Sequence, residues 1–442
     1  MHGLSRRSFV QAGAAASLLP QAQPAPNVLI LIADDMDPDL GCYGHPAIHT
    51  PNLDRLAAAG VRFSQAFVTS PQCSPSRSSM FTGRYPHANG CSRLHAPLPV
   101  RESSLVELLG GRGYYTGAFR KHHLGSQFQG RFDFYGDARQ PWNAFFDRVR
   151  RRRPFFLWVG FTDPHRPYQK GAFSPAHEPA RVVVPKYLPD TPAVREDLAL
   201  YYDEIARMDK ECGDLLGELE KRGLAENTLV FFTADNGKPF PRAKCSLYDP
   251  GTRVPLLVRW PGKIQPGVDP DLISLIDLAP TILEAASLPA PSTFQSRSFL
   301  PALLGRSQQR SRYVFAERNW HDNLDLIRSV RSERYKLIQN YRPELPYRPS
   351  LDLENSPTWS SYLEEAGQGR LPQKLRALLE PKRPEVELYD LKNDPDELEN
   401  LAEQPAHRML VEELQQALSA WMHETNDFLP PPTRVNPAGS RG

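Results

Sequence analysis

The stretch Asn27-Val-Leu-Ile-Leu-Ile-Ala-Asp-Asp35 indicates the fold class, because a continuous apolar run ends there in two carboxylates. Such a run is typical of a buried strand in a parallel sheet. Ligands of these sheets bind beyond the carboxyl ends of the strands, where Asp34 and Asp35 stand. Two buried carboxylates are costly unless a cation neutralises them, and hard oxygen ligands favour Ca²⁺ or Mg²⁺ over zinc. The pair alone is equally compatible with a helix cap and a solvated turn.

The same pattern, an apolar strand followed at once by polar residues, recurs along the chain. Residues 114–119 lead into Arg120-Lys121-His122-His123, residues 154–161 into Asp163 and His165, and residues 228–233 into Asp235 and Asn236. Helical patterns lie between these strands at residues 51–60, 104–109 and 190–221, and after a further strand pattern at 254–259 a helix is predicted at 277–286. This alternation predicts an α/β domain with a mostly parallel central sheet flanked by helices.

The polar tips of these strands suit an anion site and a metal site. Asp235 and Asn236 could complete an oxygen shell begun by the two N-terminal carboxylates. Lys121 and His123 suit an oxyanion site, and a histidine moves a proton near neutral pH, although a basic surface turn is the alternative. Lys244 follows the loop 239–241 closely enough to reach the same strand end.

The stretch Pro71-Gln-Cys-Ser-Pro-Ser-Arg-Ser-Ser-Met-Phe-Thr-Gly-Arg84 holds a candidate nucleophile. Pro75 and Ser76 are good first-turn residues, so a helix is predicted from there toward Gly83. Cys73 would then lie just ahead of a helix N-terminus, where backbone amides favour an anion, and Arg77 adds a cation. A nucleophile beside an anion hole can attack a phosphoryl or sulfuryl group. A buried structural cysteine is the alternative.

Composition limits the classes of function. The 442 residues are 40% hydrophobic and 24% charged, as in a globular protein, and suffice for a large domain and a smaller one. The formal net charge of +2 implies no general nucleic-acid role. No apolar run approaches the roughly 20 residues of a membrane span. The five cysteines have no metal-type spacing and indicate no disulfide framework.

The two ends of the chain differ in character from its centre. Ser5-Arg-Arg-Ser-Phe-Val10 precedes an apolar stretch, which predicts a twin-arginine export signal over residues 1–26, a twin-arginine translocase as partner and a periplasmic or secreted protein. Short strand patterns at 313–316, 327–330, 335–338 and 387–391, and helical ones near 371–379 and at 410–422, follow residue 310. We therefore predict a catalytic domain over 27–310 and a small α+β domain with an antiparallel sheet over 311–442.

The string around Cys73 resembles the signature of the sulfatase family, which has an alkaline phosphatase-like fold. The resemblance implies that a formylglycine-generating enzyme converts Cys73 to formylglycine (3-oxoalanine), whose hydrate attacks sulfur. It also implies that Asp34, Asp35, Asp235 and Asn236, with residue 73, bind Ca²⁺ or alternatively Mg²⁺. Arg77 would polarise the hydrate, and Lys121, His165 and Lys244 would hold the sulfuryl oxygens. His165 or Lys244 would protonate the leaving group, His123 would take the proton of the second hydroxyl, and Asp163 would touch the sugar.

Within the family, the chain resembles the sulfamidase branch, on stretches such as Val184-Pro-Lys-Tyr-Leu-Pro-Asp-Thr-Pro192 and Asp235-Asn-Gly-Lys-Pro-Phe-Pro241. This implies removal of N-sulfate from glucosamine at a heparan or heparin chain end. Sulfamidases look to have Arg where Lys244 aligns, whereas O-sulfatases have Lys, so an exo O-sulfatase acting on a carbohydrate or aryl sulfate is an alternative. The same residues are also compatible with a phosphonate or phosphodiester hydrolase and with a non-catalytic saccharide-binding protein.

Overall fold

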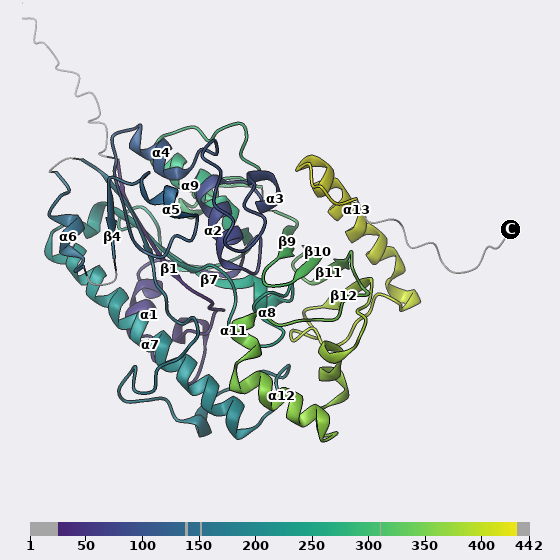
Figure 1. The fold of residues 1–442 in the computed structure, drawn as a ribbon. Helices are drawn as coiled ribbons and strands as arrows, with labels where there is room; N and C mark the ends of the chain where they lie inside the picture. The colour runs from purple at the N-terminus through teal and green to yellow at the C-terminus, as the bar shows by residue number, and fades with distance from the viewer. Residues whose placement is uncertain (1–24, 138–139, 151–152, 310, 431–442) are drawn as a thin grey trace, which may run out of the picture.

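The computed structural model describes residues 25–137, 140–150, 153–309 and 311–430. Residues 1–24 of the predicted export signal lie outside these ranges. Most of the described chain surrounds one large sheet, and a second, smaller sheet follows toward the C-terminus (Figure 1). No helix of the described ranges is both long enough and apolar enough to cross a membrane.

The large sheet has eight strands in the order β4-β3-β5-β1-β6-β7-β2-β8. Only β7 runs antiparallel to its neighbours, so the prediction of a mostly parallel sheet is confirmed. The four adjacent strands β3, β5, β1 and β6 are parallel, and their carboxyl ends therefore meet at one edge. The strands are β1 (Asn27–Ala33), β2 (Val61–Phe67), β3 (Tyr115–Arg120), β4 (Phe134–Gly136), β5 (Phe155–Gly160), β6 (Thr228–Ala234), β7 (Arg253–Arg259) and β8 (Gly267–Ser274).

Helices cover both faces of this sheet, with α2, α4 and α9 together above it and α1 and α7 below it in Figure 1. The strands between them are buried on both faces, which explains their unbroken apolar sequences. The helices are α1 (Pro51–Ala58), α2 (Cys73–Thr82), α3 (Pro86–Asn89), α4 (Leu105–Gly110), α5 (Ser126–Gln129), α6 (Asn143–Phe146), α7 (Pro192–Lys221), α8 (Asp249–Thr252), α9 (Leu278–Ala285) and α10 (Leu300–Leu303).

One glycine allows the ends of β5 and β3 to approach closely. A Cβ atom on Gly160, the last residue of β5, would lie 1.8 Å from the carbonyl oxygen of Lys121 and 2.9 Å from Nη1 of Arg77. Only glycine fits at this position without moving either group. The residues that follow β3 and β5 are therefore brought against each other at the edge where β1 also ends.

The second sheet has four antiparallel strands in the order β12-β11-β10-β9, and α13 (Arg408–Glu424) packs on it. The four predicted short strands are confirmed as β9 (Val314–Trp320), β10 (Leu324–Arg331), β11 (Tyr335–Asn340) and β12 (Val386–Asp390). The connection from β11 to β12 also contains α11 (Leu351–Glu354) and α12 (Pro357–Gly367), and a 3₁₀ helix covers Gln373–Leu379. A division of the chain at residue 310 stays a prediction.

Candidate active site

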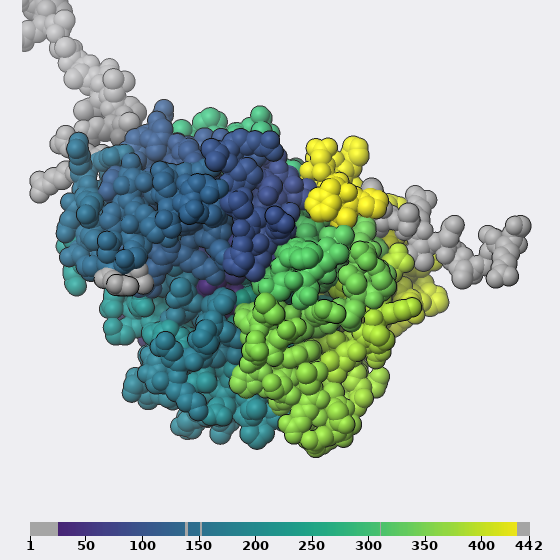
Figure 2. All heavy atoms as spheres, in the orientation of Figure 1, coloured from purple at the N-terminus to yellow at the C-terminus, as the bar shows by residue number. Residues whose placement is uncertain are grey.

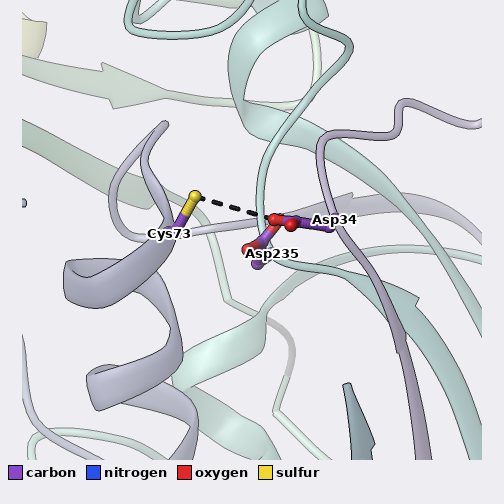
Figure 3. Close-up of side chains that lie close together, drawn as sticks. All are labelled: Asp34, Cys73 and Asp235. Atoms are coloured by element: carbon purple, nitrogen blue, oxygen red, sulfur yellow. Dashed lines mark hydrogen bonds between the residues drawn. The ribbon is translucent and has the colours of Figure 1, made fainter. Parts of the chain in front are cut away.

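The residues that follow β1 and β6 meet the start of α2 at the shared edge of the sheet. Asp34, Cys73 and Asp235 each offer one ligand atom, and these atoms all lie within 4.8 Å of one another (Figure 3). Cys73 Sγ lies 3.6 Å from Oδ1 of Asp34. All three residues are at most 2% exposed. A thiol and two carboxylates from separate parts of the chain thus form one buried cluster.

Helix α2 begins earlier than the sequence predicted, and Cys73 is its first residue. Gln72 caps it in an extended conformation, with φ −158° and ψ 148°, and Ser76 N donates 3.1 Å to the carbonyl oxygen of Gln72. The prediction that Cys73 precedes the helix was therefore wrong by two residues. The helix can include Cys73 and Ser74 because Pro75, as the third helical residue, needs no N–H donor there. The prediction that Cys73 lies at the N-terminal end of this helix still holds.

The four predicted oxygen ligands lie together. Asp35 N donates 3.0 Å to Oδ1 of Asp235, and Asn236 Nδ2 donates 2.8 Å to Oδ1 of Asp35. Oδ1 of Asn236 is buried and has no hydrogen-bond partner. A buried amide oxygen without a donor, beside three carboxylates, is a donor set that fits a hard divalent cation. These residues therefore fit the calcium or magnesium ion that the sequence implied.

Arg77 and Lys121 partly balance these carboxylates. Arg77 is fully buried; its Nε donates 2.7 Å to Oδ2 of Asp235, and its Nη1 donates 2.8 Å to the carbonyl oxygen of Lys121. Lys121 Nζ lies 2.5 Å from Oδ2 of Asp34 and 3.6 Å from Sγ of Cys73. Burial acts to raise the pKa of Asp34, but the charges of Lys121, His165 and Arg77 outweigh it, so this pKa is lowered.

Lys244 and His165 approach the cluster from its other side. Lys244 Nζ donates 2.6 Å to Oδ2 of Asp35 and lies 3.2 Å from Nε2 of His165. Lys244 is buried, while the side chain of His165 is 30% exposed. Burial opposes the charged form of Lys244, but Asp35 and other nearby acids raise its pKa well above the usual lysine value. Lys244 therefore remains a cation beside an imidazole that solvent can reach.

His123 has one ring nitrogen engaged and the other free. Its Nε2 lies 2.7 Å from Nδ1 of His95, and its Nδ1 is buried without a hydrogen-bond partner. Burial, the charges of Lys121 and Arg77, and His95 lower the pKa of His123 to about 2. The ring is therefore neutral at neutral pH, and its Nδ1 is not committed to another group of the described chain.

The carboxylate of Asp163 is paired with a guanidinium. Arg207 of α7 donates to it through Nε at 2.8 Å and Nη2 at 2.7 Å. The carbonyl oxygen of Asp163 also accepts 3.0 Å from Asp34 N, which fixes the loop after β5 against the end of β1. The structure thus places Asp163 near the other predicted residues, but as an ion pair rather than a free carboxylate.

Two residues near the site had no signal in the sequence. Asp352 of α11 accepts 2.8 Å from Lys244 Nζ and lies 3.9 Å from His165 Nε2. His95, which contacts His123, is held by its backbone N–H, which donates 3.1 Å to the hydroxyl of Ser74. Asp352 lies in the connection from β11 to β12, more than 100 residues after Lys244, and neither residue directly follows a strand of the large sheet. Only the three-dimensional structure could identify them.

Comparison with known proteins places the chain in a family. A family model described as Sulfatase matches residues 26–288, and one described as N-sulphoglucosamine sulphohydrolase, C-terminal, matches residues 242–385. The chain is 36% identical to the N-sulphoglucosamine sulphohydrolase of Homo sapiens, with 92% of each chain covered. It is 32% identical to an ulvan-active sulfatase of Formosa agariphila, with 91% of this chain and 75% of that protein covered.

The structure also resembles solved proteins. One was solved in complex with its substrate D-glucosamine-2-N,6-O-disulfate; it superimposes with a TM-score of 0.71 at 18% identity and covers 92% of this chain and 99% of its own. At this identity the likeness supports the fold, which is the alkaline phosphatase-like α/β fold that the sequence predicted. The family assignment rests on the sequence matches. The chain belongs to the sulfatase family.

Proposed function

We propose that this protein is a sulfohydrolase that removes N-sulfate from glucosamine at the end of a heparan or heparin chain. The observation that carries this proposal is the single buried cluster in which Cys73 lies 3.6 Å from Asp34 with lysine and arginine side chains around it. Similarity over 92% of the chain to a relative named N-sulphoglucosamine sulphohydrolase supports the choice of substrate.

A divalent cation, Ca²⁺ or alternatively Mg²⁺, would be held by Asp34, Asp35, Asp235 and Asn236 together with residue 73. When bound, it would supply positive charge for the nucleophile and for the sulfuryl oxygens. Asn236 would turn its unpartnered Oδ1 toward the ion, since its Nδ2 is already engaged by Asp35 and the carbonyl oxygen of Gly237.

The nucleophile would be formylglycine, formed from Cys73 by a formylglycine-generating enzyme. Its hydrate would supply two hydroxyl groups on one carbon, which is the chemistry needed to take up a sulfuryl group and then release it as sulfate. The unmodified thiol is a poor substitute, because burial and the nearby carboxylates raise its pKa well above the ordinary thiol value, and this outweighs the charge of Lys121. Arg77, held by Asp235, would orient residue 73.

Lys121, Lys244 and His165 would bind the sulfuryl oxygens, since they bring two ammonium groups and one imidazole to the cluster. His165 or Lys244 would donate a proton to the leaving nitrogen. His123 would accept a proton at its free Nδ1 and pass one from Nε2 to His95. Asp163 would contact the sugar as one half of its pair with Arg207.

Export through the twin-arginine translocase to the periplasm or the exterior remains part of the proposal, supported by the sequence of residues 5–10. That route moves folded proteins, so Cys73 could be modified in the cytoplasm first. A catalytic domain over residues 27–310 and a smaller domain over 311–442 are likewise proposed.

The proposal is tested with protein in which mass spectrometry of the peptide containing residue 73 shows formylglycine. Sulfate release is measured from N-sulfoglucosamine, glucosamine 6-sulfate and 4-nitrophenyl sulfate, and phosphonate release from a phenylphosphonate monoester. We expect the highest kcat/KM for N-sulfoglucosamine. After chelation of divalent ions, we expect no sulfate release from any of these substrates. Preference for a sulfate ester would instead identify an O-sulfatase, and preference for the phosphonate monoester would identify a phosphonate hydrolase.

A further inference from the structure

Asp352 lies between the buried Lys244 and solvent. Its carboxylate accepts 2.8 Å from Lys244 Nζ and lies 3.9 Å from Nε2 of His165. The side chain of Lys244 is 1% exposed, whereas that of Asp352 is 20% exposed. A recess in the surface, with atoms of the purple N-terminal segment at its floor, separates the blue and teal part from the green C-terminal part (Figure 2). Of Lys244 and Asp352, the latter is therefore the side chain that solvent reaches.

The position of Asp352 is fixed by the small sheet. Leu351 N donates 2.8 Å to Oδ2 of Asp322, and the same carboxylate oxygen lies 2.8 Å from Nδ1 of His321. Asp322 follows strand β9. Two apolar side chains lie next to this contact in the sequence. Trp320, at the end of β9, is 45% exposed, and Leu351, at the start of α11, is 57% exposed. The loop end of β9 and the start of α11 thus present a carboxylate together with exposed apolar side chains, a combination suited to a sugar ring.

A carboxylate at this place is a disadvantage for an enzyme that binds anions. Asp35 already pairs with Lys244 at 2.6 Å, so Asp352 is a second acid on the same ammonium. One ammonium thus faces two carboxylates and can balance only one negative charge, so Asp352 repels an approaching sulfate and attracts a group that is cationic or donates hydrogen bonds. Asp163, two residues before His165 in the sequence, is by contrast already neutralised by Arg207.

The two candidate leaving groups differ in this respect. Cleavage of an S–N bond yields an amine, which takes a proton near neutral pH and becomes an ammonium. Cleavage of an S–O bond in a sugar yields a neutral alcohol. A carboxylate within hydrogen-bond reach stabilises an ammonium by a charge-assisted hydrogen bond, about twice as strong as a bond to a neutral group.

We propose that Asp352 is the specificity-determining residue of the leaving-group subsite, where it binds the nitrogen on C2 of the terminal glucosamine and selects sulfamates over sulfate esters. This inference rests on the proposed function, because it presumes an amino sugar in the site. No bond is made or broken by Asp352; the leaving nitrogen receives its proton from His165 or Lys244, and Asp352 accepts a hydrogen bond from the resulting ammonium.

The test separates binding from turnover. In a Cys73→Ala background, which cannot turn over, calorimetry at pH 6 measures the binding of glucosamine and of glucose. We expect Asp352→Asn to weaken glucosamine binding about tenfold or more while glucose binding changes less than about twofold. Glu354→Gln, an equal change of charge at an exposed position of the same short helix, is the matched control and leaves both affinities unchanged. Equal losses for both sugars, or no loss for glucosamine, would overturn the inference.

A second measurement uses the formylglycine-bearing enzyme. Asp352→Asn should lower the ratio of kcat/KM for N-sulfoglucosamine to that for 4-nitrophenyl sulfate about tenfold or more, and Asp352→Glu should restore part of it. Thermal unfolding checks that each variant is folded. If the wild type hydrolyses N-sulfoglucosamine and the ratio of the two kcat/KM values is unchanged in Asp352→Asn, this inference fails and the proposed function stands. If the wild type hydrolyses no sulfamate, the proposed function fails, and this inference fails with it.

Discussion

Arg77 Nε donates to Oδ2 of Asp235 at 2.7 Å, and both side chains are fully buried. The same guanidinium lies 3.5 Å from Oδ1 of Asp34, so one buried cation serves two of the proposed metal ligands. Because Arg77 also donates to the carbonyl oxygen of Lys121, it joins the start of α2 to the ends of β1, β3 and β6. Structure and charge balance of the site therefore depend on the same residue.

Replacement of Arg77 should make the protein less stable. Arg77→Met leaves two buried carboxylates without their guanidinium, which should lower the free energy of unfolding by about 3–5 kcal/mol in the presence of a chelator. Urea unfolding measures this difference. Arg195 forms a short bidentate pair with Asp190 on the surface, and Arg195→Met is the control that should change stability little. If both substitutions lowered the free energy of unfolding equally, the buried ion pair would contribute no more to stability than the surface pair.

Asp235→Asn should weaken Ca²⁺ binding at least about tenfold, because it removes the charge of a proposed ligand that lies next to Asp34 and Asp35. Calorimetric titration of chelator-treated protein measures the affinity. The control is Asp390→Asn, which removes a carboxylate paired with Arg334 on the small sheet. Wild-type affinity in the Asp235 variant would argue against a ligand role for this residue.

Cys73→Ala should preserve the fold and abolish turnover. The thiol makes two long, weak hydrogen bonds, at 3.6 Å to Asp34 and 3.6 Å to Lys121, so its loss costs little stability. Circular dichroism and sulfate release measure the two properties. Cys212→Ala, at a buried thiol within α7, should retain turnover and is the matched control. Unchanged rate in the Cys73 variant would contradict the mechanism.

The strand tips could be predicted from sequence because each is a local pattern. Strands buried on both faces need uninterrupted apolar runs, so β1, β3, β5 and β6 were visible, and with them Asp34, Asp35, Asp235 and Asn236. Strands β2 and β8 were not predicted, because they lie toward the edge of the sheet, are partly exposed, and contain polar residues and Pro270.

Long-range pairings had no such local pattern. The helical period of α7 indicated a core helix, and nothing in it showed that Arg207 would neutralise Asp163. Asp352 reaches Lys244 from a connection between two strands of the other sheet, and His95 lies in the chain between α3 and α4. Such residues are placed by tertiary packing alone, and therefore the sequence predicted the centre of the site but not its outer contacts.

The free energy of unfolding should fall as the pH drops from about 6.5 to about 4, in part because of His122. Burial and the charge of Arg77 lower the pKa of His122 to about 4, whereas an unfolded histidine titrates near 6.5. Below pH 6.5 the unfolded chain binds a proton that the folded protein does not, so stability is lost as the pH falls. His122→Gln should reduce this loss by up to about 3 kcal/mol in urea unfolding. The exposed His423→Gln should leave the pH dependence unchanged.

His95→Gln should slow turnover, because it removes an exposed imidazole that contacts His123 and could pass its proton to solvent. His95 lies 2.7 Å from His123 and is itself exposed, whereas His123 is neutral and its other nitrogen is buried. If protons leave through this pair, kcat should fall about 10²-fold or more with little change in KM. Added imidazole should restore part of the rate in His95→Ala, since a small base can occupy the space of the lost ring. His49→Gln, at another exposed histidine, should have no effect. A rate that is unchanged, or one that falls without rescue by imidazole, would show that His95 only supports the loop anchored by Ser74.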